Sequence, residues 1–155
     1  MMLSLAGDLL DFSQLKNGKF RKNESLFDVK KCIEEIVMIQ QFKADKLGIE
    51  MFCDFSPISQ GSHMVHSDSH RLGQVVMNLL SNAIKFTEEG IIQVNAVKLN
   101  TQVTIEIIDT GIGIPPDKYD LLFEPFQHFD QTKGSLYSGS GLGLSISRQL
   151  VRLHG

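Results

Sequence analysis

The chain has 155 residues, 42% of them hydrophobic, and its 15 basic and 18 acidic side chains give a formal charge of -3. That length suits one domain with a proper core and excludes two domains of ordinary size. The charge excludes a general attraction to nucleic acid or anionic lipid, so any phosphate group must be bound locally. Because no apolar run approaches about 18 residues, we expect no membrane contact from this segment, while a longer parent protein could be membrane-anchored. Two cysteines and no secretory signal favour a cytoplasmic location.

In the first half of the chain, hydrophobic periodicity predicts two helices and three short strands. Asp28 is a suitable N-cap for the second helix, and Gly48 can end it. We expect Cys32 and Cys53 to be packing residues. The second helix is amphipathic, with apolar residues at Val29, Ile33, Ile36, Val37 and Phe42. In chain order the elements cover residues 3–15 (helix), 19–27 (strand), 29–47 (helix), 49–55 (strand) and 64–67 (strand).

The second half predicts a long helix, a β-hairpin, a long loop and a last helix. Asp68 or Ser69 caps the long helix, in which a broad apolar stripe runs from Leu72 to Ile84. The loop is rich in glycine, proline and polar residues, and a loop of this length inside a compact domain is usually functional. The elements cover residues 69–84 (helix), 91–99 and 102–109 (strands), 110–138 (loop, with a helical piece near 117–122) and 142–153 (helix).

Three polar residues form a strip along the long helix. Asn78 and Asn82 are four residues apart and Lys85 lies one further turn along, so all three share one face. An amide oxygen is a hard ligand suited to Mg²⁺, and a lysine ammonium suits the charge of a phosphate. For this segment alone, an exposed helix face without a ligand is the alternative.

Two glycine-containing segments follow. Asp109-Thr110-Gly111-Ile112-Gly113-Ile114 ends the hairpin, where a carboxylate could accept a hydrogen bond from an exocyclic amine such as that of adenine. An ordinary turn after a strand is the alternative. Gly139-Ser140-Gly141-Leu142-Gly143-Leu144 opens the last helix and offers unpaired N–H groups to an anion. No Lys-Ser or Lys-Thr pair follows these glycines, so they are not a P-loop.

In order and type, four motifs resemble those of the sensor histidine kinases. Residues 78–87, Asn-Leu-Leu-Ser-Asn-Ala-Ile-Lys-Phe-Thr, resemble their N box, and residues 109–114 their first glycine box. Phe123-Glu124-Pro125-Phe126 is similar to the F box, and residues 139–144 to the second glycine box. Upstream, Leu9-Leu10-Asp11-Phe12-Ser13 with Gly18-Lys19 resembles the end of the dimerisation and phosphotransfer helix, especially in hybrid kinases.

This resemblance implies an α/β two-layer sandwich: a mixed, mainly antiparallel sheet covered by helices, with ATP held beneath a flexible lid. Residues 1–18 would be the end of the dimerisation helix and its linker, and residues 19–155 the ATP-binding catalytic domain without its final strands. The implied cofactors are ATP and Mg²⁺. The implied partners are a phosphoacceptor histidine domain, in the parent protein or in another chain, and a downstream receiver domain or response regulator.

By the same similarity, Asn82 would bind Mg²⁺ with support from Asn78, and Lys85 would contact the phosphates, so Asn78 and Lys85 are the implied catalytic residues. Asp109 would recognise the adenine amine. For Phe86 and Phe126, core packing alone is the alternative. The residues implied to contact the nucleotide are Asn82, Phe86, Asp109, Gly111, Gly113, Ile114, Phe126, Lys133, Gly139, Ser140, Gly141, Leu142 and Gly143.

The gyrase, mismatch-repair and heat-shock chaperone ATPases share the glycine boxes but carry a glutamate at the position of Asn78. An amide cannot act as the general base for water, so Asn78 favours phosphoryl transfer over hydrolysis. The implied function is therefore donation of the ATP γ-phosphoryl group to a histidine. A regulatory nucleotide-binding module or pseudokinase of the same superfamily is the alternative.

Three departures from the family qualify this expectation. None of the five histidines lies in the Glu-rich helical context of a phosphoacceptor, so the acceptor is expected on a separate domain. Family members continue with two strands after the last helix, whereas this sequence stops at Gly155, and an exposed sheet edge would follow. A basic residue often precedes the second glycine box, and here only Lys133 lies near. We expect a monomer or weak association.

Overall fold

The computed structural model describes residues 2–55, 63–100, 102–127 and 140–154. The chain divides into two compact units, one continuous from Asn23 to Gly113 and the other made of residues 1–22 and 114–155. In chain order the elements are α1 (Met2–Lys16), β1 (Ser25–Asp28), α2 (Val29–Lys46), β2 (Ile49–Asp54), β3 (Met64–Ser67), α3 (Ser69–Phe86), β4 (Gly90–Leu99), β5 (Gln102–Asp109), the 3-10 helix η1 (Pro116–Leu121) and α4 (Gly143–His154).

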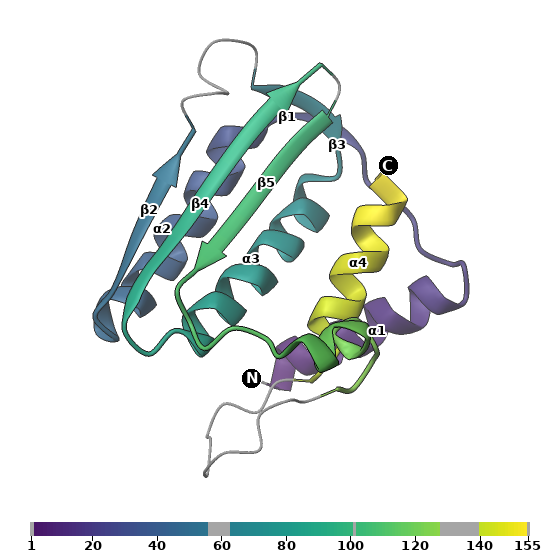
Figure 1. Ribbon diagram of the computed structural model, residues 1–155. Coiled ribbons are helices and arrows are strands. Elements are labelled where there is room, and N and C mark those ends of the chain that lie inside the picture. The colour runs from purple at the N-terminus through teal and green to yellow at the C-terminus, as the bar shows by residue number, and fades with distance from the viewer. Residues whose placement is uncertain (1, 56–62, 101, 128–139, 155) are drawn as a thin grey trace. The chain divides into compact units, whose positions relative to one another are not determined.

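A three-stranded sheet with two helices on one face makes up most of the continuous unit (Figure 1). β2 runs parallel to β4, with Ile49 opposite Gly90, and β5 runs antiparallel to β4, with Asp109 opposite Ile92. A parallel pair needs a crossover connection, and α3 is part of the one between β2 and β4. β1 and β3 form a separate antiparallel pair. The expected mixed, mainly antiparallel sheet covered by helices is confirmed.

Aspartate side chains cap both helices of this unit, as the sequence predicted. The Asp28 carboxylate accepts a hydrogen bond from the Lys31 amide at 3.1 Å. Asp68 accepts two: its Oδ1 from the Arg71 amide at 3.1 Å and its Oδ2 from the Asn23 amide at 2.8 Å. The first-turn amides of a helix have no partner within the helix, so the bonds from Lys31 and Arg71 satisfy groups that would otherwise need water.

The core of the continuous unit lies between the sheet and the inner faces of α2 and α3. Gln40 on α2 is a polar member with 1% of its surface exposed, and its side-chain nitrogen donates to the Met77 sulfur. Leu80 is fully buried, and truncation of such a residue to alanine costs about 2 to 5 kcal/mol. The apolar members are Val29, Ile33, Ile36, Val37, Ala44, Ile49, Phe55, Val76, Leu80, Ala83, Ile84, Ile92, Val94 and Ala96.

Two expectations about the first half of the chain are wrong. The first strand begins at Ser25 and not at residue 19, because the Asn23 amide donates to a side chain, that of Asp68, and not to a neighbouring strand. Phe42 is 64% exposed although its spacing assigned it to the apolar face of α2. The Lys46 ammonium lies 4.2 Å from the centre of its ring, a cation–π contact that suits an exposed aromatic.

The two cysteines differ in their surroundings. Cys32 packs against the core as expected, whereas Cys53 is exposed and lines a groove of 540 Å³ together with Phe42. The expectation that Cys53 is a packing residue is therefore wrong. Partial burial raises the pKa of both thiols, and a nearby carboxylate, Glu35 for Cys32 and Glu34 for Cys53, raises it further. Both thiols are thus less nucleophilic at neutral pH than an ordinary cysteine.

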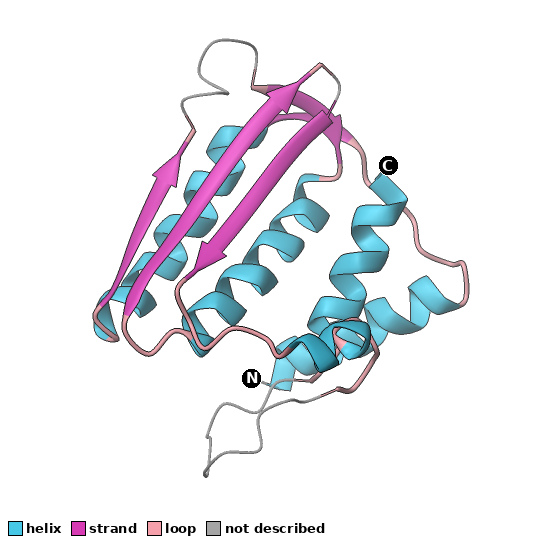
Figure 2. Ribbon diagram, in the orientation of Figure 1, coloured by secondary structure: helices cyan, strands magenta, loops and turns pink. Residues whose placement is uncertain are grey.

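The second unit contains α1, η1 and α4, all drawn as helices in Figure 2. α1 and α4 contact each other. Leu142, Ile146 and Leu150 are buried, and their spacing of four residues puts them on one side of the last helix. The expected first and last helices and the short helical piece near residues 117–122 are all present, to within one residue at each end.

Candidate functional site

The polar strip lies on α3 where the sequence placed it. Asn78, Asn82 and Lys85 are all half-buried, and their spacing puts them on one side of the helix. The neighbouring side of the helix packs into the core through Leu80 and Ile84, so the strip has a fixed orientation relative to the sheet. The Lys85 ammonium lies 4.7 Å from the centre of the Phe86 ring.

The end of α3 and the segment after β5 meet through their backbones. The Ile112 amide donates to the Phe86 carbonyl oxygen at 3.1 Å. A Cβ atom at Gly111 would stand 2.3 Å from that same oxygen and 2.8 Å from Asp109 Oδ1. Real Cβ atoms do not approach other atoms so closely, so glycine is required at this position. The close approach also fixes the segment that follows Asp109 relative to α3.

A second close approach joins the end of β5 to the start of β4. The Thr110 hydroxyl oxygen accepts from the Ile91 amide at 3.0 Å, and the Thr110 amide donates to the Ile91 carbonyl at 3.2 Å. A Cβ atom at Gly90, whose φ is +131°, would stand 2.1 Å from the Thr110 hydroxyl oxygen. Thr110 thus extends the hairpin beyond its last ladder pair, and it holds the Asp109 backbone in place.

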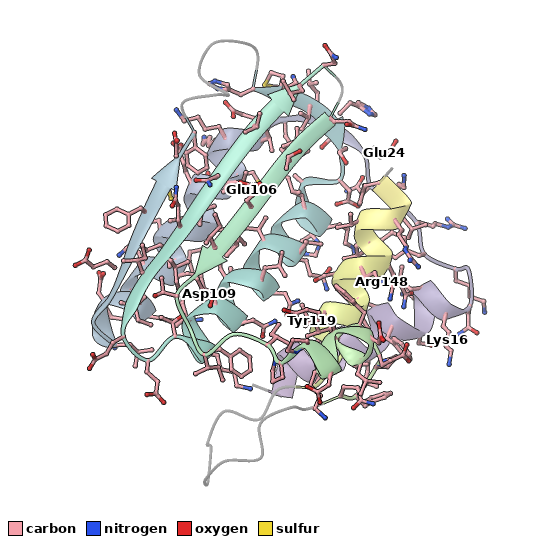
Figure 3. The ribbon with its side chains drawn as sticks, viewed as in Figure 1. Lys16, Glu24, Glu106, Asp109, Tyr119 and Arg148 are labelled. Carbon is pink, nitrogen blue, oxygen red and sulfur yellow. The ribbon has the colours of Figure 1, made fainter. Side chains whose placement is uncertain are left out.

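Asp109 is exposed at the last position of β5 (Figure 3). Its Oδ1 accepts the Gly111 amide at 2.9 Å, which orients the carboxylate. A carboxylate has two oxygens with about four lone-pair sites, so a bond to one amide leaves capacity to accept from a ligand amine. Gly113, at φ +66°, has no atom within 4 Å of a Cβ position, so its glycine is required by the backbone angle and not by space.

The donor set on α3 fits a magnesium ion that takes most of its ligands from elsewhere. Asn78 and Asn82 offer amide oxygens one turn apart. In the described part of the chain, no group of three or more His, Cys, Asp or Glu side chains is arranged to hold a metal. A site with one or two protein oxygens suits Mg²⁺, which keeps waters and takes phosphate oxygens, and does not suit a metal that needs a complete protein cage.

In the other unit, the F box and the second glycine box also meet through their backbones. The Phe126 amide donates to the Gly141 carbonyl oxygen at 2.9 Å. Gly141 has a φ of +66°, and a Cβ atom there would stand 2.9 Å from the Phe126 Cα. Phe126 itself has a φ of +64°, which is rare for a bulky residue and indicates that the surrounding contacts hold it there.

The start of α4 offers backbone amides to an anion. The first helical hydrogen bond runs from the Ile146 amide to the Leu142 carbonyl, so the amides between them have no partner within the helix. The Leu142 amide donates to the Ser140 hydroxyl oxygen at 3.2 Å. Leu142 as a whole residue is 1% exposed, so its backbone is covered as well as its side chain. Gly143, the first residue of α4, is half-buried.

Sequence reasoning missed two contacts that α1 makes with these boxes. The Ser140 hydroxyl donates to Asp8 Oδ2 at 2.9 Å. The Phe12 and Phe126 rings meet edge to face, with centres 5.9 Å apart and planes inclined at 72°. The segment 9–13 had suggested only a junction between domains, and no local pattern joins residues more than one hundred positions apart.

The remaining expected site residues are less informative. Ile114 is 45% exposed. Lys133 and Gly139 lie in the segment 128–139, which is outside the described residues and includes the later part of the expected loop over residues 110–138. Among the helices of the described chain, none is long and apolar enough to cross a membrane.

The exposed Asp109, the asparagine-lysine face of α3 and, in the other unit, a helix start with amides that have no partner within the helix are each features expected of a nucleotide-binding α/β protein. Residues 67–155 match the model of the histidine kinase-, DNA gyrase B- and HSP90-like ATPases. The chain belongs to this family, and within it the chain is of the sensor histidine kinase type.

Sequence relatives support that type. The chain is 38% identical over 156 residues to the autoinducer 2 sensor kinase/phosphatase LuxQ of Vibrio cholerae, covering 98% of this chain and 18% of LuxQ. It is 37% identical to the signal transduction histidine-protein kinase BarA of Escherichia coli, covering 97% of this chain and 17% of BarA. The chain thus spans about a fifth of the length of these relatives.

Solved structures agree with the fold. Full-length ShkA in complex with AMPPNP superposes with a TM-score of 0.82 at 29% identity, over 97% of this chain and 30% of ShkA. The catalytic domain of the histidine kinase ThkA superposes with a TM-score of 0.70 at 27% identity, over 87% of this chain and 82% of that domain. A third structure, ThkA with the response regulator TrrA, shares the fold at 22% identity and a TM-score of 0.71 over 99% of this chain and 42% of ThkA.

Proposed function

We propose that this chain binds ATP with Mg²⁺ and donates the γ-phosphoryl group to a histidine on a separate domain, as the catalytic part of a two-component sensor kinase. The observation that carries the proposal is the exposed Asp109 carboxylate, oriented by the Gly111 amide and fixed beside α3 by the Ile112 bond to Phe86. The family match covers residues 67–155, and it supports the roles proposed for the polar strip of α3 and for the start of α4.

In this proposal, each site residue has a role that follows from the chemistry of its side chain or backbone. Asp109 accepts from the exocyclic amine of adenine, which gives a preference for ATP over GTP because guanine carries a carbonyl oxygen at that position. Asn82, supported by Asn78, holds Mg²⁺ through its amide oxygen, and Lys85 neutralises phosphate charge. The amides at the start of α4 bind phosphate oxygens.

Asn78 decides between transfer and hydrolysis in this proposal. A side-chain amide cannot take a proton from water, so the residues supply positioning and charge neutralisation and leave the nucleophile to come from a partner. That partner is a phosphoacceptor histidine domain, and a receiver domain or response regulator accepts the phosphoryl group next. We propose that residues 1–18 belong to the end of the dimerisation helix and that residues 19–155 form the catalytic domain.

A titration with a fluorescent ATP analogue tests the nucleotide site. We expect saturable binding that Mg²⁺ strengthens and that Asp109→Asn weakens by at least tenfold, since an amide nitrogen then faces the adenine amine or the amide must flip. Glu106→Gln is the matched control, because Glu106 lies on the same strand (Figure 3) and its carboxylate contacts the Asn95 side chain. Equal binding by wild type and Asp109→Asn would refute the assigned role.

A second experiment tests the reaction. The chain is mixed with labelled ATP and a dimerisation domain taken from a related hybrid kinase, with and without the acceptor histidine of that domain. We expect label on the acceptor only when its histidine is present, and an amount that falls strongly with Lys85→Ala. Intact ATP binding without any labelling of several acceptor domains would favour the regulatory reading over the kinase.

A further inference from the structure

One face of α1 contacts the second glycine box and the F box. Asp8, Phe12 and Lys16 are spaced by four residues, so they lie on one side of the helix. Asp8 accepts the Ser140 hydroxyl, and Phe12 packs edge to face on Phe126. The Lys16 ammonium lies 5.5 Å from the centre of the Phe12 ring. α1 therefore contacts the glycine box directly, and it also contacts the F-box residue that is hydrogen-bonded to that box.

The hydrogen bonds around Ser140 fix which atom donates to which. A carboxylate oxygen only accepts, so the single hydroxyl proton of Ser140 points to Asp8. The Ser140 oxygen then accepts from the Leu142 amide at 3.2 Å. The Ser140 hydroxyl, which could donate to a phosphate oxygen at this box, is thus occupied within the chain.

We infer that α1 competes with the nucleotide phosphates for the second glycine box, with Asp8 as the competing group. The inference rests on the function proposed above. A phosphate oxygen and the Asp8 carboxylate are both acceptors, and one hydroxyl proton serves only one of them.

Phe126 provides a second connection between the glycine box and α1. The Phe126 amide donates to the Gly141 carbonyl, and a Cβ atom at Gly141 would clash with the Phe126 backbone, so these two residues move together. A ligand that displaces the glycine box therefore also displaces Phe126, whose ring packs on Phe12. Release of α1 and occupation of the box are linked, and by reciprocity each favours the other.

The direct test is nucleotide affinity in variants of the full chain. Asp8→Ala removes the competing acceptor and is expected to lower the dissociation constant for MgATP about three- to tenfold, the range of one hydrogen bond. Asp8→Asn keeps an oxygen that accepts the Ser140 proton but removes the charge, so its effect should be smaller. Asp11→Ala is the comparison variant, because it removes a carboxylate from the same helix, three residues from Asp8, and leaves the Asp8 bond to Ser140 in place.

A double-mutant cycle separates this mechanism from a general change in α1. In a Ser140→Ala chain the hydroxyl is gone, so Asp8→Ala should no longer change the affinity. An Asp8→Ala chain that binds MgATP with the wild-type constant or more weakly overturns the inference, because the bond would then support the box and not compete for it. If wild type and every variant fail to bind, the proposed function itself is wrong and the inference falls with it.

Hydrogen exchange supplies a readout that a purely structural contact would not give. We expect saturating MgATP to speed amide exchange in residues 9–16 of wild type, because bound phosphate releases α1. Adenosine, which has no phosphate, should not do so. Unchanged or slower exchange of α1 at saturating MgATP would contradict the competition, whatever the affinities of the variants.

Discussion

An alanine at position 111 would place a methyl group too close to the C-terminal end of α3. The new carbon would stand 2.3 Å from the Phe86 carbonyl oxygen, 2.8 Å from the Phe86 carbonyl carbon and 2.8 Å from Asp109 Oδ1. Two of these atoms belong to the backbone of a helix packed into the core, so they cannot rotate away. The segment after β5 must therefore move outward, and its hydrogen bonds go with it.

The size of the effect follows from what is lost. Forcing an extra carbon into a filled space costs about 1 to 3 kcal/mol. Loss of the Ile112 bond to Phe86, and of the Gly111 bond to Asp109, adds about 0.5 to 1.5 kcal/mol for each. Because these terms overlap, we expect Gly111→Ala to lower the free energy of unfolding by about 2 to 4 kcal/mol.

Two measurements are needed, urea unfolding and titration with a fluorescent ATP analogue. The outward movement displaces Asp109, so we expect at least a tenfold loss of affinity under conditions where the protein is still folded. Gly48→Ala is the matched control: Gly48 has a φ of +73° but nothing within 4 Å of a Cβ position. Its alanine should cost about 1 to 2 kcal/mol of stability through the backbone angle alone and leave affinity unchanged.

If Gly111→Ala unfolds at the same urea concentration as wild type, the close approach does not constrain the chain. If it is destabilised but binds nucleotide normally, the position of Asp109 does not depend on the Phe86 contact. Either result would refute the reasoning that links this glycine to the site.

Three further predictions concern single side chains. Asp109→Asn should narrow the preference for ATP over GTP in competition titrations, because an amide can donate to the guanine oxygen; an unchanged ratio would count against adenine recognition by Asp109. Asp68→Ala should lower the free energy of unfolding by about 2 kcal/mol, more than Asp28→Ala, because Asp68 accepts two backbone amides and is 3% exposed; a smaller loss than for Asp28 would contradict this. Glu34→Gln should speed alkylation of Cys53 at pH 8, because removal of the carboxylate lowers the raised pKa of that thiol and increases its thiolate fraction; no acceleration would show that Glu34 does not act on it.

Local chemistry made much of the fold predictable. Asp28 and Asp68 are recognisable as caps because each directly precedes the first turn of a helix. The left-handed Gly48 is recognisable because it follows the last turn of α2. The alternation in residues 91–109 gave the β4–β5 hairpin, and the polar strip of α3 followed from helical spacing alone. Each of these signals lies within a few residues of the structure it determines.

Other features had no such signal. The parallel pairing of β2 with β4 depends on the path of the chain between them, and the alternation within β2 is the same for either direction of pairing. Gln40 is buried although its type favours the surface, because α2 places it opposite Met77. The left-handed Phe126 is recognisable only from its contacts with the glycine box, and these depend on residues distant in sequence.

The division of the chain has a consequence for its synthesis. Residues 23–113 are continuous, so this unit is complete once residue 113 has been added, whereas the other unit needs residues 1–22 and 114–155 together. At about 5 to 20 residues per second, the last 42 residues take roughly 2 to 8 s to make. During that interval α1 has no α4 to contact, and its apolar residues are available to chaperones or to neighbouring nascent chains. We therefore expect the order of translation, and not only the final stability, to determine how often this protein folds correctly.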